Sequence, residues 1–204
     1  MILPESIKPM STKILFIFFT FFFIGTVQGQ NFSELVSDKT MSISAKAYNG
    51  FYTEFDFNAK NVERGWWDYS RSFGRPLNMR GYYKVTIPSD VNSGTVDLVL
   101  LSRTVSGKNS CGFFLCLDES NISKDKILDY KKQLKVILKD FKKTYYIEQL
   151  EDVLEQLEKK AIKTSKKVSK AKGKSKERFL QDLETQQEHI AQTKAKLKEI
   201  YNAF

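Results

Sequence analysis

The sequence predicts an α+β fold in which a small antiparallel β-sheet domain is followed by a long C-terminal α-helical hairpin, an antiparallel coiled coil. Three observations predict it. Several segments before residue 120 alternate apolar and polar side chains, as half-buried strands do. From residue 124 onward apolar residues recur at steps of three and four, as they do in packed helices. A lysine-rich block with Gly173 at its centre interrupts the helical pattern and indicates a reversal of the chain.

The N-terminus has the pattern of a secretory signal peptide. Residues 14–27 form an uncharged, mostly apolar run that follows two lysines and ends before the small residue Gly29. The run is shorter than the roughly 20 residues of a spanning helix. We therefore expect residues 1–29 to be a signal peptide cleaved before Gln30, with an uncleaved membrane anchor as the alternative. The mature chain is then periplasmic or secreted, without a transmembrane helix.

Residues 30–120 form the predicted antiparallel β domain. Residues 41–47 alternate between apolar and small or polar side chains, and residues 51–57 alternate in the same way. Asn49 and Gly50 between them readily adopt the positive φ values of a two-residue turn. We expect a β-hairpin with its turn at these two residues.

Three further strands are expected in this domain, at residues 82–87, 95–104 and 112–117, joined by short turns that favour antiparallel neighbours. Within the second of them, residues 96–101 are apolar on both faces except for one aspartate, which predicts a central strand covered on both sides. Residues 58–79 mix charges, two tryptophans, glycine and proline without one period. We interpret them as a long connection with a short strand or a turn of helix.

Residues 124–204 predict the helical hairpin. Their apolar stripe changes phase between Phe141 and Ile147, so the first section is expected to lie on the sheet and the second to meet the returning helix. Gln187 and Lys194 are expected to weaken the seam of the return. The return has apolar residues at intervals of seven: Leu183, Ile190, Leu197 and Phe204. Whether the hairpin projects, folds back on the sheet or oligomerises is left open.

The positive charge is confined to the tip of this hairpin. The whole chain has a net charge of +9, and residues 30–123 carry equal numbers of basic and acidic side chains. The block from Lys159 to Arg178 holds ten basic residues against one acid, Glu177. We interpret the tip as a contact for an anionic surface, or otherwise as a solvated helix turn. The residues expected to make the contact are Lys163, Lys166, Lys167, Lys170, Lys172, Lys174 and Lys176.

Aromatic residues are concentrated in the β domain. Aromatic rings beside arginine can stack on sugars or bases, which makes Trp66, Trp67, Tyr69 and Arg71 candidates for ligand binding. Export argues against nucleic acid as the ligand. In extended backbone the two tryptophans point to opposite faces, which favours the alternative that these rings form the core and rim of a small sheet.

Few residues in the chain suggest catalysis or metal binding. His189 is the single histidine, and no Cys/His spacing completes a zinc site. Glu54 and Asp56 share one strand face, which is more typical of a solvated surface than of acid/base catalysis. Cys111 and Cys116 are five residues apart, roughly 16 Å in extended chain, which favours two buried thiols over a disulfide bond. We expect no catalytic residue, metal or cofactor.

These observations together predict an exported, non-enzymatic protein that acts through protein–protein or cell-envelope contacts. The alternative is a module that binds a small apolar ligand or a glycan at the aromatic-rich β domain, with the helices as a lid. An enzyme that uses carboxylates alone is a third possibility.

Overall fold

The computed structural model describes residues 36–92 and 96–203. The predicted signal peptide lies outside them. In chain order the elements are β1 (Ser37–Ile43), β2 (Lys46–Phe55), α1 (Ala59–Ser70), β3 (Arg75–Asn78), β4 (Tyr83–Ile87), α2 (Ser89–Asn92), β5 (Leu98–Ser106), β6 (Cys111–Leu117), the 3₁₀ turn η1 (Glu119–Asn121), α3 (Lys124–Lys170) and α4 (Lys174–Ala203). Among the described residues, no helix combines the length and the apolar composition needed to span a membrane.

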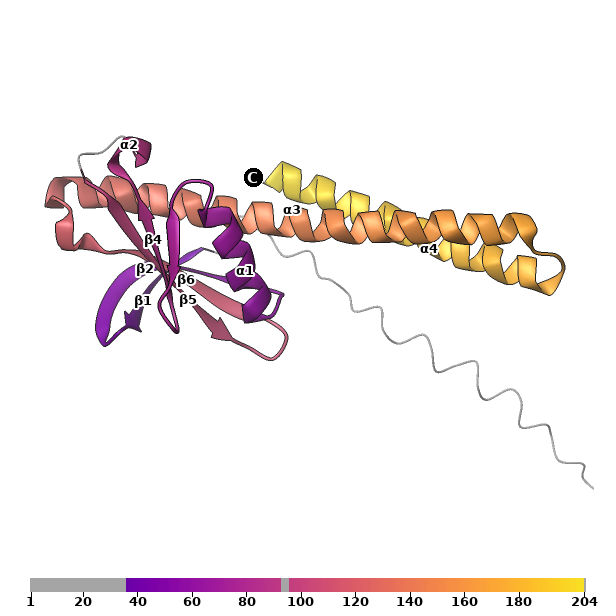
Figure 1. Cartoon of the computed structure of the whole chain (residues 1–204), viewed down its shortest axis with the longest axis horizontal. Helices are drawn as coiled ribbons and strands as arrows, with labels where there is room; N and C mark the ends of the chain where they lie inside the picture. Colours follow the sequence, from indigo (N-terminus) through magenta and orange to yellow (C-terminus); the bar gives the residue numbers. More distant parts are fainter. Residues whose placement is uncertain (1–35, 93–95, 204) are drawn as a thin grey trace, which may run out of the picture. The chain divides into compact units, whose positions relative to one another are not determined.

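The six strands form one antiparallel sheet in the order β1-β2-β6-β5-β4-β3, followed by the helix pair α3 and α4 (Figure 1). This confirms the predicted α+β class with a C-terminal helical hairpin. The last strand in sequence, β6, lies between β2 and β5. It joins the two halves of the open sheet by pairing residues about 60 positions apart, such as Gly50 with Cys116.

The first hairpin turn differs from the prediction. β1 and β2 are joined by Ser44 and Ala45, with φ values of 49° and 64°, and Asn49 and Gly50 lie inside β2. Glycine is needed at position 50 because strand β6 approaches the backbone closely there, and not because of a turn. A Cβ atom at Gly50 would meet the backbone oxygen of Leu115 and, at 2.7 Å, the Cβ of Cys116 on the neighbouring strand.

The stretch interpreted as a long connection is also different, because it contains the 12-residue helix α1 and the edge strand β3. The Asn58 side chain caps α1 by accepting a 3.0 Å hydrogen bond from the backbone N–H of Asn61. Val62, Trp66 and Ser70 are buried at steps of four, which is the helical period. The partly exposed Trp67 beside them obscures this period in the sequence.

Helices α1 and α3 pack on one face of the sheet, where the main core lies. Trp66, Phe113 and Phe141 meet there, with ring centroids 5.1–5.3 Å apart. The other face holds a smaller cluster of buried residues: Ile43, Leu101, Phe114 and Cys116. The strand predicted to be covered on both sides is β5, which begins at Leu98 and is only partly buried. The strand in which every residue is buried is its neighbour β6.

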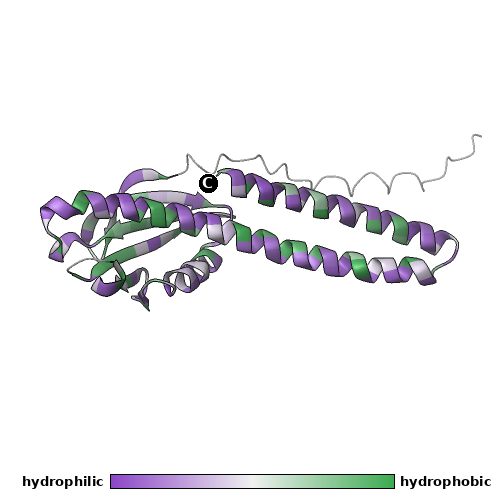
Figure 2. Ribbon diagram, turned by 90° about the horizontal axis from the view of Figure 1, so that it is seen from above, coloured by the Kyte–Doolittle hydropathy of each residue, from purple (hydrophilic) through white to green (hydrophobic). Residues whose placement is uncertain are grey.

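Helix α3 is continuous over 47 residues and changes its packing partner along its length. Its first half packs on the sheet through buried residues that end with Tyr145 and Tyr146. Its second half runs alongside α4 (Figure 2), and Lys194 of α4 forms a 3.0 Å ion pair with Glu158 of α3. The change of phase in the apolar stripe therefore marks the change of partner, as predicted.

The seam on α4 contains Leu183, Ile190 and Leu197, as predicted. The intervening positions are Gln186 and Thr193, one residue before the predicted Gln187 and Lys194, which are exposed. Near its C-terminal end α4 contributes the buried Ile200 to the main core, so the return of the hairpin reaches the sheet domain. The predicted seam residue Phe204 lies outside the described residues.

Candidate functional site

The lysine-rich tip is built by the ends of α3 and α4. Helix α3 ends at Lys170, the linking Gly173 has a φ of 55°, and α4 begins at Lys174. Glycine suits this left-handed conformation at a helix boundary. Tyr146, the last α3 residue of the main buried cluster, lies 24 residues before Lys170, or about 36 Å along the helix. The tip is therefore far along α3 from the sheet.

All seven predicted contact lysines are exposed. Among the described residues from 150 to 203, the ion pairs are Lys159 with Glu155 and Lys194 with Glu158, and none of the seven lysines takes part in one. The Nζ of Lys167 lies 5.6 Å from the ring centroid of Phe179, a partly buried residue of α4. The tip thus presents several ammonium groups whose charge no neighbouring carboxylate neutralises.

The aromatic candidates lie on α1 and do not form one platform. Trp66 has no exposed surface and packs in the core, whereas Trp67 lies partly exposed, 6.0 Å from the ring of Tyr83. Tyr69 donates a 2.7 Å hydrogen bond to Asp140 of α3, and burial together with this carboxylate raises the pKa of Tyr69. Arg71 follows the helix and is exposed. Trp66 and Tyr69 thus pack toward the core, whereas Trp67 and Arg71 lie nearer the surface.

A buried lysine, Lys142, was not expected. Its side chain is 1% exposed, and its Nζ donates a 3.0 Å hydrogen bond to Thr53 Oγ1 of β2. Burial lowers the pKa of Lys142 to about 8, and the charges of Asp56 and Glu54 oppose this change. The sequence gives little indication that Lys142 is buried, because most lysines of α3 are exposed. Its position next to the buried Phe141 is the one local hint.

The two carboxylates predicted on one strand face, Glu54 and Asp56, each accept a hydrogen bond from a tyrosine hydroxyl. Glu54 accepts a 3.4 Å hydrogen bond from the Tyr52 hydroxyl. The backbone N–H of Asp56 donates to the Tyr146 hydroxyl at 3.1 Å, and that hydroxyl donates to the Asp56 carboxylate at 3.3 Å. Asp56 therefore fixes the end of β2 against α3, which is a structural role.

The two cysteines are free thiols on opposite faces of β6. Burial raises the pKa of Cys111 to about 11 and that of Cys116 to about 12, so both are protonated at neutral pH. Buried, protonated thiols are poor nucleophiles.

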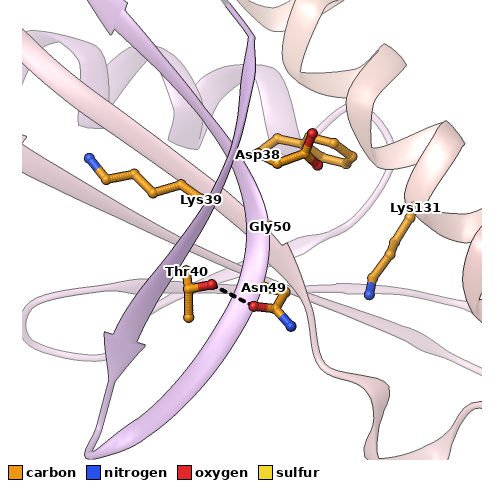
Figure 3. Close-up of a pocket in the computed structure, with 7 residues that line it drawn as sticks. Asp38, Lys39, Thr40, Asn49, Gly50 and Lys131 are labelled. Atoms are coloured by element: carbon orange, nitrogen blue, oxygen red, sulfur yellow. Dashed lines mark hydrogen bonds between the residues drawn. The ribbon is translucent and has the colours of Figure 1, made fainter.

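An open pocket of about 350 Å³ lies between the β1–β2 hairpin and α3. Figure 3 shows Lys131 reaching toward the hairpin from α3, and the 2.6 Å hydrogen bond that the Thr40 hydroxyl donates to Asn49. Among the residues that line this pocket, Asp38 is the one with a carboxylate. Within the described residues, no group of three or more His, Cys, Asp or Glu side chains could hold a metal ion.

No protein-family model matches this chain, and neither the comparison with curated proteins nor that with solved structures finds a match. Inference about function therefore depends on the geometry and charge of the chain itself.

Proposed function

We propose that this protein is exported and acts without catalysis, through protein or cell-envelope contacts, with the lysine-rich tip as the part that contacts an anionic surface. The observation that supports the proposal is the cluster of seven exposed lysines, none of them in an ion pair within the described chain, about 36 Å along α3 from the sheet. The N-terminal sequence pattern supports export.

The energetics favour a multivalent contact. A lysine close to an anionic membrane surface contributes about 1 kcal/mol, and the attraction fades within a Debye length of about 8 Å at physiological ionic strength. One lysine is therefore too weak to keep the protein on a membrane, whereas the contributions of several lysines at one tip add up. No aromatic residue and no leucine lies between Lys163 and Lys176 to insert into a bilayer, so the contact is electrostatic at the headgroup level.

Binding to lipid vesicles tests the proposal. Vesicles with a substantial fraction of phosphatidylglycerol should sediment the protein at low salt, and vesicles of phosphatidylcholine alone should not. Raising the salt concentration should release the protein because the attraction is screened. Equal sedimentation with both vesicle types would contradict an electrostatic contact.

The alternative, a ligand beneath the aromatic cluster of the β domain, has less support. Trp66 is fully buried against Phe113 and Phe141, so its ring offers no surface to a sugar or an apolar ligand. Only Trp67 and Tyr69 of the candidate aromatic residues are partly accessible.

A further inference from the structure

One face of α3 carries acidic residues near the sheet and basic residues near the tip. Five turns of an α-helix take 18 residues. That is the spacing from Glu148 to Lys166 and from Asp152 to Lys170, so each acid and its lysine leave the helix in the same direction, with the charge reversed about 27 Å along it. The two pairs lie about 40° apart around the helix. We call this face the charged stripe: Glu148, Asp152, Glu155, Lys159, Lys163, Lys166 and Lys170.

The charged stripe faces away from α4. The side chains that pack toward α4 include Leu150 and Leu154, each two residues after an acid of the stripe, and a step of two turns about 200° around the helix. Every residue of the stripe is exposed. The stripe is therefore an accessible, unpartnered face of α3 in the described part of the chain.

The acidic end of the stripe borders a cleft of about 390 Å³ between α1 and α3. Its charged residues are Arg64 and Asp68 of α1 with Glu148 and Asp152 of α3, so carboxylates outnumber cations. None of these three acids takes part in an ion pair within the described chain. Partial desolvation, and after it the negative charges of Asp68, Asp152 and Glu151, raise the pKa of Glu148.

Tyr145 lies at the base of this cleft and supplies a second, independent feature. The residue is 3% exposed, and its hydroxyl is buried without a hydrogen-bond partner in the described structure. One edge of its ring lies against Gly65, which also lines the cleft. Burial, with smaller effects from Cys111 and Glu148, raises the pKa of the Tyr145 hydroxyl to about 12. An ammonium group entering the cleft would meet the carboxylates of Asp68, Glu148 and Asp152.

We propose that two copies of this chain associate through the charged stripe, antiparallel, with Lys166 and Lys170 of the second copy placed at Asp152 and Glu148 of the first. A twofold axis makes both halves of the contact equivalent, so each cleft receives the tip of the other copy. Glu155 then lies opposite Lys163 of the second copy. At the axis Lys159 faces Lys159 of the second copy, and each is held by its own Glu155 at 2.6 Å.

This contact is weak and sensitive to salt, because exposed ion pairs contribute little individually and are screened. It also covers lysines of the tip, so the dimer and an anionic surface compete for the same side chains. The dimer does not depend on the proposed surface contact, and either could fail alone.

Sedimentation velocity with charge reversal tests the dimer. We expect the purified protein to show a concentration-dependent dimer at about 50 mM salt and a monomer at about 500 mM. The variants Glu148→Lys/Asp152→Lys and Lys166→Glu/Lys170→Glu should each be monomeric at low salt. Their equimolar mixture should restore the dimer, because all four pairs at the two ends of the contact then again have opposite charges. Circular dichroism should show wild-type helix content in both variants.

A wild-type protein that stays monomeric at low salt, a dimer that survives either reversal, a mixture that stays monomeric, or growth beyond a dimer would each overturn the proposal. The Glu148→Lys/Asp152→Lys variant retains every lysine of the tip. It should therefore still bind anionic vesicles when the dimer is lost, which separates failure of this inference from failure of the proposed function.

Discussion

The Nζ of Lys142 donates a 3.0 Å hydrogen bond to Thr53 Oγ1, and this contact joins α3 to β2 inside the protein. The ammonium group also lies 5.6 Å from the ring centroid of Phe55 and 5.9 Å from that of Tyr146. Charged groups in such surroundings are costly to bury, and a buried lysine responds by a lower pKa. The contact thus positions the long helix at a cost in stability that depends on pH.

Replacing Lys142 by Met should stabilise the protein near pH 7. The folded-state pKa of about 8 lies below the unfolded value of 10.5, so the unfolded chain binds more protons between these values. The stability of the wild type should therefore rise with pH from about 8 toward 10.5 as this group loses its proton, relative to the variant. Between pH above 10.5 and pH below 8 the difference should shift by about 3 kcal/mol in favour of Met, and the lost hydrogen bond to Thr53 lowers the stability of the variant at every pH.

Urea unfolding of both proteins at several pH values from 7 to 9.5 measures this difference. The tyrosines that titrate at higher pH are common to both, so the difference isolates Lys142. A constant difference across this range would contradict a depressed pKa.

Two substitutions in the β1–β2 hairpin should act in opposite directions. Ala45→Gly should stabilise the protein by about 1 kcal/mol, because Ala45 has a φ of 64°, which is unfavourable for residues with a Cβ. Gly50→Ala should destabilise it by about 2 kcal/mol or more, because the new methyl group meets the backbone of β6. Denaturant midpoints of the two variants check both signs, and the reverse pair of signs would place the turn at Asn49–Gly50.

That turn shows what local sequence does not determine. Asn49–Gly50 is the stronger turn signal, yet the close approach of β6 to Gly50 determines where glycine is needed. That constraint comes from pairing between Gly50 and Cys116, far apart in sequence. The position of β6 between β2 and β5 is non-local for the same reason. Periods of two and of three to four residues could be predicted because each element imposes them locally.

The candidate sites follow the same division. The exposure of the tip lysines agrees with a charge pattern that is visible in the sequence. Helix α1 was missed because Trp67 and the charges around it obscure the step of four that links Val62, Trp66 and Ser70. The cleft between α1 and α3 could not be predicted, since it needs Asp68 and Glu148 brought together by the fold.

The two adjacent tryptophans should differ sharply in their contribution to stability. Trp66→Ala should cost about 3–5 kcal/mol, because the ring is fully buried among Phe113, Phe141 and Tyr69. Trp67→Ala should cost clearly less, since Trp67 is partly exposed. Thermal unfolding of the two variants measures this, with a glycan-binding assay in parallel. Glycan binding that disappears in a Trp67→Ala variant of unchanged stability would favour the alternative function over core packing.

The most direct test of the central claim compares two variants with the same net charge. The first replaces the tip residues Lys163, Lys166, Lys167 and Lys170 by Gln. The control replaces four exposed lysines outside the hairpin tip by Gln: Lys60, Lys108, Lys124 and Lys126. Sedimentation with phosphatidylglycerol vesicles measures the partition coefficient of each. We predict that the tip variant loses binding by more than about tenfold while the control binds like the wild type. Equal binding by the tip variant and the wild type would contradict the claim that the tip makes the contact.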